Sequence, residues 1–93
     1  MNLYDVARDL GQLPREGAIY VPQGGVTVNG STLALVVLPG EDPPADWRYL
    51  LEVFIAREVV EVWSSWRDSR VPSIGEACEA IVYYADNDAY QED

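Results

Sequence analysis

The amino-acid sequence predicts an α+β fold: an antiparallel sheet of three to four strands, with one N-terminal and two C-terminal helices packed mainly on one face. The first reason is the order of the patterns, because a short helical segment precedes several β segments and two helical segments close the chain. The second is a hydrophobic content of 48%, which argues against disorder despite a net charge of −10. A length of 93 residues leaves room for one domain, which we expect to cover residues 1–93.

The first element is a short helix over about residues 3–10. Asn2 suits its N-cap, and Gly11 suits a left-handed residue that ends it. Apolar side chains recur at i, i+3, i+4 and i+7, which predicts a buried face made of Leu3, Val6, Ala7 and Leu10. The segment Ala18–Val21 then reads as a short strand that ends at Pro22.

Two β segments follow the first strand. Val26-Thr27-Val28 and Ser31-Thr32-Leu33 flank Asn29-Gly30, which is the pattern of a hairpin with a two-residue type I′ turn. The segment Thr32–Leu38 is nearly all apolar, which is typical of a central strand covered on both faces. An acidic, proline-rich loop leads on to the next element.

The stretch Trp47–Trp66 holds all three tryptophans and the only phenylalanine. Side chains alternate over about residues 48–54, which predicts a strand, and they follow a helical period over about residues 55–68. One continuous helix would span roughly 34 Å, which is long for a domain whose radius of gyration should be about 12 Å. We expect the helix to expose Arg57, Glu58 and Glu61, and to bury Ile55, Val59, Trp63 and Trp66.

The last element is a helix that runs from a capping box, Ser73 and Glu76, to about Ala85. Asn87 suits the left-handed position that follows it. The helical period assigns Glu76, Glu79, Ala80 and Tyr83 to the exposed side. It assigns to the buried side Ile74, Ala77, Cys78, Ile81, Val82 and Ala85.

The residue types that carry most enzyme chemistry are missing from this sequence. It contains no histidine, no lysine and a single cysteine, Cys78, which we expect to be a buried small residue. Glu58 and Glu61 share a helical face, but a solvated face does not separate the pKa values of two carboxyl groups as acid–base catalysis requires. We therefore expect no enzyme activity, no catalytic residue, no cofactor and no metal site.

The charge is concentrated in the second part of the chain. Residues 1–40 carry three acids and two arginines, whereas residues 41–93 carry thirteen acids and four arginines. Such a surface repels nucleic acid and anionic membranes, so we expect neither as a direct partner and instead expect a basic protein. No apolar run approaches the roughly 18 residues of a membrane span, and no secretory signal is visible. We therefore expect a cytoplasmic protein.

Aromatic residues set among acids are the candidate partner-binding residues. Tyr83 shares a helical face with two glutamates, Tyr90 lies in the acidic C-terminal segment, and Trp47 follows an acidic loop. This combination suits contacts with arginine and lysine. For Trp47 and Tyr90 the alternative is that the ring folds back onto the core. The full candidate set is Trp47, Glu58, Glu61, Glu76, Glu79, Tyr83, Asp86, Asp88 and Tyr90.

Two segments carry a resemblance to a known group of proteins. Ala80–Tyr90 resembles the closing segment of a family of small uncharacterised bacterial proteins, which ends in tyrosines, a variable position, Asp-Asn-Asp-Ala and an aromatic residue. Leu13–Tyr20 resembles the first strand of the same family. This resemblance implies no particular activity. In size and acidity the chain is also similar to the immunity proteins of bacterial toxin systems, which implies an inhibitor of a toxin domain.

Three functional hypotheses follow from these observations. The first is an immunity-type inhibitor that neutralises a basic toxin or nuclease domain by occluding its cationic site. The second is a phage- or mobile-element-encoded, anti-CRISPR-like inhibitor of a nucleic-acid-binding defence complex, which acts by partial DNA mimicry. The third is an adaptor or structural domain with no inhibitory role, whose acidity only maintains solubility.

Overall fold

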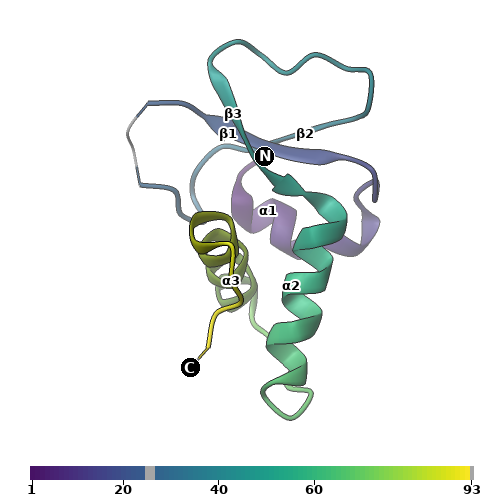
Figure 1. Ribbon diagram of the computed structural model, residues 1–93, viewed down its shortest axis with the longest axis vertical. Helices are drawn as coiled ribbons and strands as arrows, with labels where there is room; N and C mark the ends of the chain where they lie inside the picture. Colours follow the sequence, from purple (N-terminus) through teal and green to yellow (C-terminus); the bar gives the residue numbers. More distant parts are fainter. Residues whose placement is uncertain (25–26, 93) are drawn as a thin grey trace.

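The computed structural model describes residues 1–24 and 27–92 (Figure 1). The molecule is elongated, with extents of 41 × 27 × 21 Å. Its described elements follow the predicted order of helix, strands and helices. They are α1 (Leu3–Arg8), the 3₁₀ helix η1 (Leu10–Gln12), β1 (Ala18–Pro22), β2 (Leu35–Val37), β3 (Trp47–Glu52), α2 (Val53–Ser65) and α3 (Ile74–Asn87).

The strands of the described residues form an antiparallel sheet with the order β2-β1-β3. The prediction that Thr32–Leu38 is a central strand is wrong, because β1 is central and β2 is a three-residue edge strand. The first half of the segment pairs with the N-terminus instead. Leu3 N donates to Thr32 O at 3.0 Å, and Ala34 N donates to Met1 O at 2.9 Å. An apolar run therefore predicted a strand but not its neighbours.

The predicted two-residue hairpin around Asn29-Gly30 is also wrong. Thr32 N donates to Asn29 O at 3.0 Å, so the turn runs from Asn29 to Thr32, and Val28 lies outside any strand. Gly30 does not use a left-handed φ; the ring of Tyr4 packs so closely on it that a Cβ would lie 2.1 Å from a ring carbon. The glycine is thus required for close approach. Val26, the first residue of the predicted hairpin, lies outside the described residues.

The division of Trp47–Trp66 into a strand and a helix is confirmed, with α2 starting two residues earlier than expected, at Val53. A β-bulge interrupts the alternation predicted for the strand. Ile19 of β1 pairs with Leu51, but Tyr20 pairs with Tyr49, so β3 has one extra residue, Leu50. Because of this bulge, Tyr49 points away from the helices while Leu51 and Leu50 are both buried.

The predicted caps are confirmed at the helix starts and wrong at the ends. Asn2 and Asp5 form a capping box before α1, as Ser73 and Glu76 do before α3. However, α1 ends at Arg8, two residues before the expected end, and Gly11 lies within η1. The left-handed residue after α3 is Asp88, with φ of 52°, rather than Asn87.

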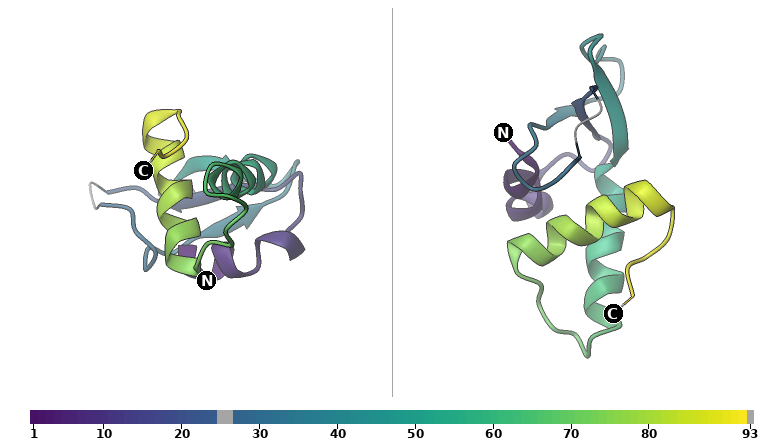
Figure 2. Two further views of the ribbon diagram at one scale, coloured as in Figure 1. Left: turned by 90° about the horizontal axis from the view of Figure 1, so that it is seen from below. Right: turned by 90° about the vertical axis from the view of Figure 1, so that its left-hand side faces the viewer.

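The helices lie on one side of the sheet, and α3 packs against both α1 and α2 (Figures 1 and 2). The predicted α+β class is therefore confirmed. Two positions of α3 are exchanged relative to the prediction, since Ala80 is buried and Ile74 is 44% exposed. In the described part of the chain, no helix has the length and apolar character needed to cross a membrane. The core is formed mainly by Leu3, Val6, Ile19, Val21, Leu51, Val53, Ala56, Val59, Cys78 and Ile81.

Candidate protein-binding surface

The C-terminal segment joins two of the predicted partner-binding residues. After α3 the chain turns back and runs beside α2 (Figure 2, right). The Tyr90 hydroxyl donates to a Glu58 carboxylate oxygen at 2.8 Å, across 32 residues of sequence. The ring of Tyr90 contacts Trp66 and Tyr84, with centroid separations of 5.8 Å and 5.2 Å. Tyr90 is half-buried and packs against the core, as the alternative interpretation of this residue predicted.

Trp66 forms the exposed part of this aromatic cluster. The helical period assigned it to the buried face of α2, and this prediction is wrong, because 52% of its surface is exposed. Figure 2 shows that α3 crosses the middle of α2, so the last turn of α2 extends past the helix that covers the rest. Periodicity identifies the face of a helix, but it does not reveal where the covering element ends.

Trp63 lies one turn earlier and is only 4% exposed. The guanidinium groups of Arg67 and Arg70 lie 4.3 Å and 4.6 Å from its ring centroid. Arg67 also donates to Trp63 O at 3.0 Å, and Arg70 donates to both Glu76 carboxylate oxygens, at 3.2 Å and 3.1 Å. Two of the six arginines of the sequence therefore hold the α2–α3 connection around a buried tryptophan.

The carboxylate of Glu76 binds groups of this connection. It accepts from the backbone N–H of Ser73 at 3.0 Å as well as from Arg70. These hydrogen bonds, the one from Ser73 N–H first, lower the pKa of the Glu76 carboxyl group. Glu76 was predicted to be a partner-binding residue, and the contacts it makes are those of a helix cap.

The remaining predicted residues of α3 lie on its outer side. Glu79 accepts from the Gln91 side-chain amide at 2.8 Å. Tyr83, one turn later, is 38% exposed, and Asp86 is exposed beyond it. The i, i+4, i+7 spacing of these three residues aligns them on one strip of the helix. Asp88 follows as the exposed left-handed cap.

Glu61 lies on the exposed side of α2, in a shallow hollow of about 400 Å³ that it shares with Glu58, Phe54 and Arg57. Arg57 was expected to be solvated, and this is wrong. Its guanidinium donates to the carbonyl oxygens of Leu10 at 3.0 Å and Leu13 at 2.5 Å, and so ties η1 to α2. Sequence periodicity missed this role because the carbonyl groups come from a segment more than forty residues away.

Trp47 is separated from the other eight predicted residues. It is the first residue of β3, where it pairs with Pro22, and it is half-buried but not part of the core cluster. In Figure 1, β3 begins at one end of the molecule and α2 ends at the other. The predicted residues therefore occupy two surfaces. We call the surface formed by Glu58, Glu61, Trp66, Tyr83 and Tyr90 the helical surface.

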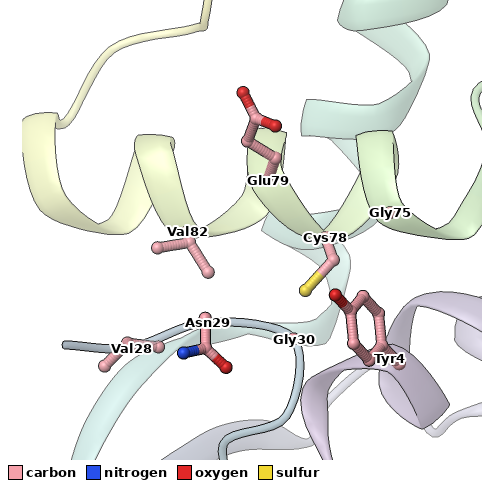
Figure 3. Close-up of a pocket in the computed structure, with 8 residues that line it drawn as sticks. All are labelled: Tyr4, Val28, Asn29, Gly30, Gly75, Cys78, Glu79 and Val82. Atoms are coloured by element: carbon pink, nitrogen blue, oxygen red, sulfur yellow. The ribbon is translucent and has the colours of Figure 1, made fainter. Parts of the chain in front are cut away.

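A small pocket lies between α3, α1 and the segment 28–30 (Figure 3). Cys78 and Val82 point into it from α3, whereas Glu79 points away. Its volume of about 230 Å³ is below the roughly 300–1,000 Å³ typical of small-molecule sites. Burial raises the pKa of the Cys78 thiol, which disfavours the reactive thiolate form. The pocket is thus a poor candidate for either a ligand or a nucleophile.

Comparison with protein-family models, with curated protein sequences and with solved structures found no match for this chain. Within residues 1–24 and 27–92, no cluster of three or more metal-ligating side chains is positioned to hold an ion. The chemistry of the surface is therefore the feature from which a function can be inferred.

Proposed function

We propose that this protein is a small acidic inhibitor that binds proteins: an immunity-type protein that neutralises a basic toxin or nuclease domain by occluding its cationic site. The observation that carries the proposal is the helical surface, where Trp66 is exposed against Tyr90, the Tyr90 hydroxyl donates to Glu58, and Tyr83 is exposed on α3. Exposed tryptophan and tyrosine among charges are typical of the residues that dominate protein–protein binding energy.

The mechanism is steric and electrostatic. Acids around the aromatic rings attract a basic partner and accelerate encounter, while the rings supply apolar contact area once the complex forms. Glu61, Asp86 and Asp88 are exposed and available for this, and Tyr83 lies on the same side of α3 as Asp86. Glu76 contributes less, because it already serves Arg70 and the start of α3.

Several further features belong to the same proposal. We expect a binding protein rather than an enzyme, because histidine is absent and the pocket beside Cys78 is small. A single unpaired thiol is compatible with a reducing cytoplasm, where we expect the protein to act. The resemblance of residues 80–90 to small bacterial proteins is compatible with a bacterial origin.

Charge density separates this proposal from DNA mimicry. The molecule exposes 5605 Å² for ten net charges, or about 560 Å² per charge. Duplex DNA, with one charge per roughly 1.7 Å of axis, exposes only about 110 Å² per charge. The acids are also divided between two surfaces. We therefore place the phage-encoded inhibitor of a nucleic-acid-binding defence complex second, and a purely structural adaptor third.

A binding experiment at two salt concentrations tests the proposal. The immobilised protein should retain a basic partner at about 0.1 M salt and release it at about 1 M, where the Debye length falls from about 10 Å to about 3 Å. The activity of the purified partner should then be lost on addition of this protein. Retention of no basic protein at low salt, or a partner whose activity is unaffected, would overturn the proposal.

Matched variants locate the interaction. Glu79→Lys and Tyr83→Ala should each weaken binding while leaving the melting temperature nearly unchanged, since both side chains lie on the outside of α3. Asp9→Lys makes the same change of net charge as Glu79→Lys on a different element, and it should weaken binding far less. Equal losses from Glu79→Lys and Asp9→Lys would indicate attraction by net charge alone.

A further inference from the structure

The face of the sheet that points away from the helices carries apolar side chains. Because neighbouring residues in register point to the same side, Leu35, Tyr20 and Tyr49 form one row across the three strands. Val37, Ala18 and Glu52 form the next row, and Trp47 pairs with Pro22 beyond. We call this the outer sheet face and define it as Ala18, Tyr20, Leu35, Val37, Trp47 and Tyr49.

Polar side chains are expected on a sheet face that meets only water. Here the rings of Tyr20 and Tyr49 instead meet edge to face, with centroids 6.0 Å apart. Tyr49 remains 47% exposed. The bulge at Leu50 creates this arrangement, because without the extra residue Tyr49 would fall on the helix side. The outer sheet face is therefore an apolar surface without a helix packed on it.

Three carboxylates surround a pocket at the edge of this face. The pocket has a volume of about 280 Å³ and is lined by Ala18, Tyr20 and Val37 of the sheet and by Glu16, Glu41 and Glu52, whose carboxylates we call its rim. This volume is small for a drug-sized ligand and suits one inserted side chain.

Two of the rim carboxylates are held in place. Glu41 accepts from the backbone N–H of Leu38 at 2.7 Å. Glu52 accepts from the hydroxyl group of Tyr49, which couples the carboxylate to the aromatic row. Arg15, the cation nearest along the chain, lies over the ring of Phe54, 5.9 Å from its centroid, and lines an adjoining hollow with Glu16 and Glu52. Three carboxylates and one arginine at this edge leave an excess of negative charge beside the ring of Tyr20.

We propose that the outer sheet face docks a cationic protein partner and that its acid-rimmed pocket receives an arginine side chain of that partner. A guanidinium group stacks on aromatic rings and pairs with carboxylates in two-point contacts, which lysine does less well. A second copy of this chain is disfavoured as the occupant, because each copy carries a net charge of −10. The cationic character of the partner rests on the proposed function.

A titration followed by ¹H–¹⁵N NMR tests the pocket directly on the full chain. The probe is N-acetyl-arginine amide, and the control is N-acetyl-citrulline amide, which has nearly the same shape but no charge. The arginine probe should shift the amide signals of Ala18–Tyr20, Leu38, Gly40 and Glu41, and the citrulline probe should not. Equal shifts with both probes, or shifts confined to α3, would overturn the assignment.

Isosteric variants sharpen the test without removing packing. Glu16→Gln and Glu52→Gln should each weaken binding of the arginine probe by about twofold to fivefold, the range of partly exposed ion pairs. Asp68→Asn, at an exposed position after α2 that belongs to neither surface, is the matched control and should leave the affinity unchanged. A loss of affinity with Asp68→Asn as large as that with Glu52→Gln would show that net charge, and not the pocket, attracts the probe.

The two proposals fail separately. If the arginine probe does not bind but a basic partner is retained and inhibited, then the inhibitor function stands and the outer sheet face is not its arginine site. If the probe binds in the pocket but no basic protein is retained at low salt, the pocket stands and the inhibitor function fails.

Discussion

The helical surface and the outer sheet face each contain a tyrosine whose hydroxyl donates to a glutamate. Tyr90 and Glu58 come from distant parts of the chain, and their hydrogen bond holds the C-terminal segment against α2. Tyr49 and Glu52 are three residues apart on one strand, and their bond holds no second element in place. The first pair stabilises the fold, whereas the second arranges charge beside an uncovered surface. Similar residue pairs can therefore join distant elements in one region and remain within one strand in another.

This difference extends to the acids around each pair. On the helical side, Glu58, Glu76 and Glu79 accept hydrogen bonds from elements other than their own helix turn. On the sheet side, within the described part of the chain, Glu41 and Glu52 accept hydrogen bonds from residues three positions away. Most acids of the sequence lie in residues 41–93. Of these, three glutamates on α2 and α3 bind other segments of the chain, whereas the two on the sheet side bind residues of their own segment.

The largest expected effect concerns the tryptophans of α2. Trp63→Ala should lower the free energy of unfolding by about 3–5 kcal/mol, because the side chain is buried beneath Arg67 and Arg70. Trp66→Ala should cost less than about 1 kcal/mol, since half of that side chain is exposed. Chemical denaturation of both variants measures the contrast. Similar losses would place Trp66 in the core after all.

The second effect concerns the contact between η1 and α2. Arg57→Ala should lower the free energy of unfolding by about 2 kcal/mol, because it removes two charged hydrogen bonds to the carbonyl groups of Leu10 and Leu13. Arg48→Ala, at an exposed position of β3, is the control and should stay within about 0.5 kcal/mol. An equally small effect of Arg57→Ala would show that the contacts of η1 with α2 persist without this side chain.

The third effect is the pH dependence of Tyr49 on the outer sheet face. Partial burial, and then the hydrogen bond and negative charge of Glu52, raise the pKa of Tyr49 to about 12. The folded-state pKa lies above the unfolded value of about 10, so this contribution to stability is complete below pH 10 and is lost as pH rises through 12. Glu52→Gln should lower the pKa of Tyr49 in an ultraviolet titration of tyrosinate. An unchanged titration would show that Glu52 does not contact Tyr49.

The smallest stability effect is expected at Tyr83. Because this side chain lies on the outer side of α3, Tyr83→Ala should change the free energy of unfolding by less than about 0.5 kcal/mol. Thermal denaturation provides the measurement. A large loss would assign Tyr83 to the core and remove it from the helical surface.

Local features of this fold were predictable because they depend on neighbours in sequence. The predicted N-cap at Asn2 and the predicted capping box at Ser73 use partners three residues away, and both are present. The division of Trp47–Trp66 follows from a change of period, and it is confirmed to within two residues. The helix ends were harder to predict, because the stop after α1 and the left-handed residue after α3 depend on the path that the chain takes next.

The sequence by itself determined the α+β class, the starts of the helices, the acidic character of the surface and the absence of histidine and lysine chemistry. Tertiary structure decided which apolar strand became central, that Trp66 is left uncovered, and that a bulge turns Tyr49 outward beside Glu52. The physical reason is that periodicity records which side of an element is apolar. Whether that side is covered depends on the lengths and crossing points of other elements, which lie far away in the chain.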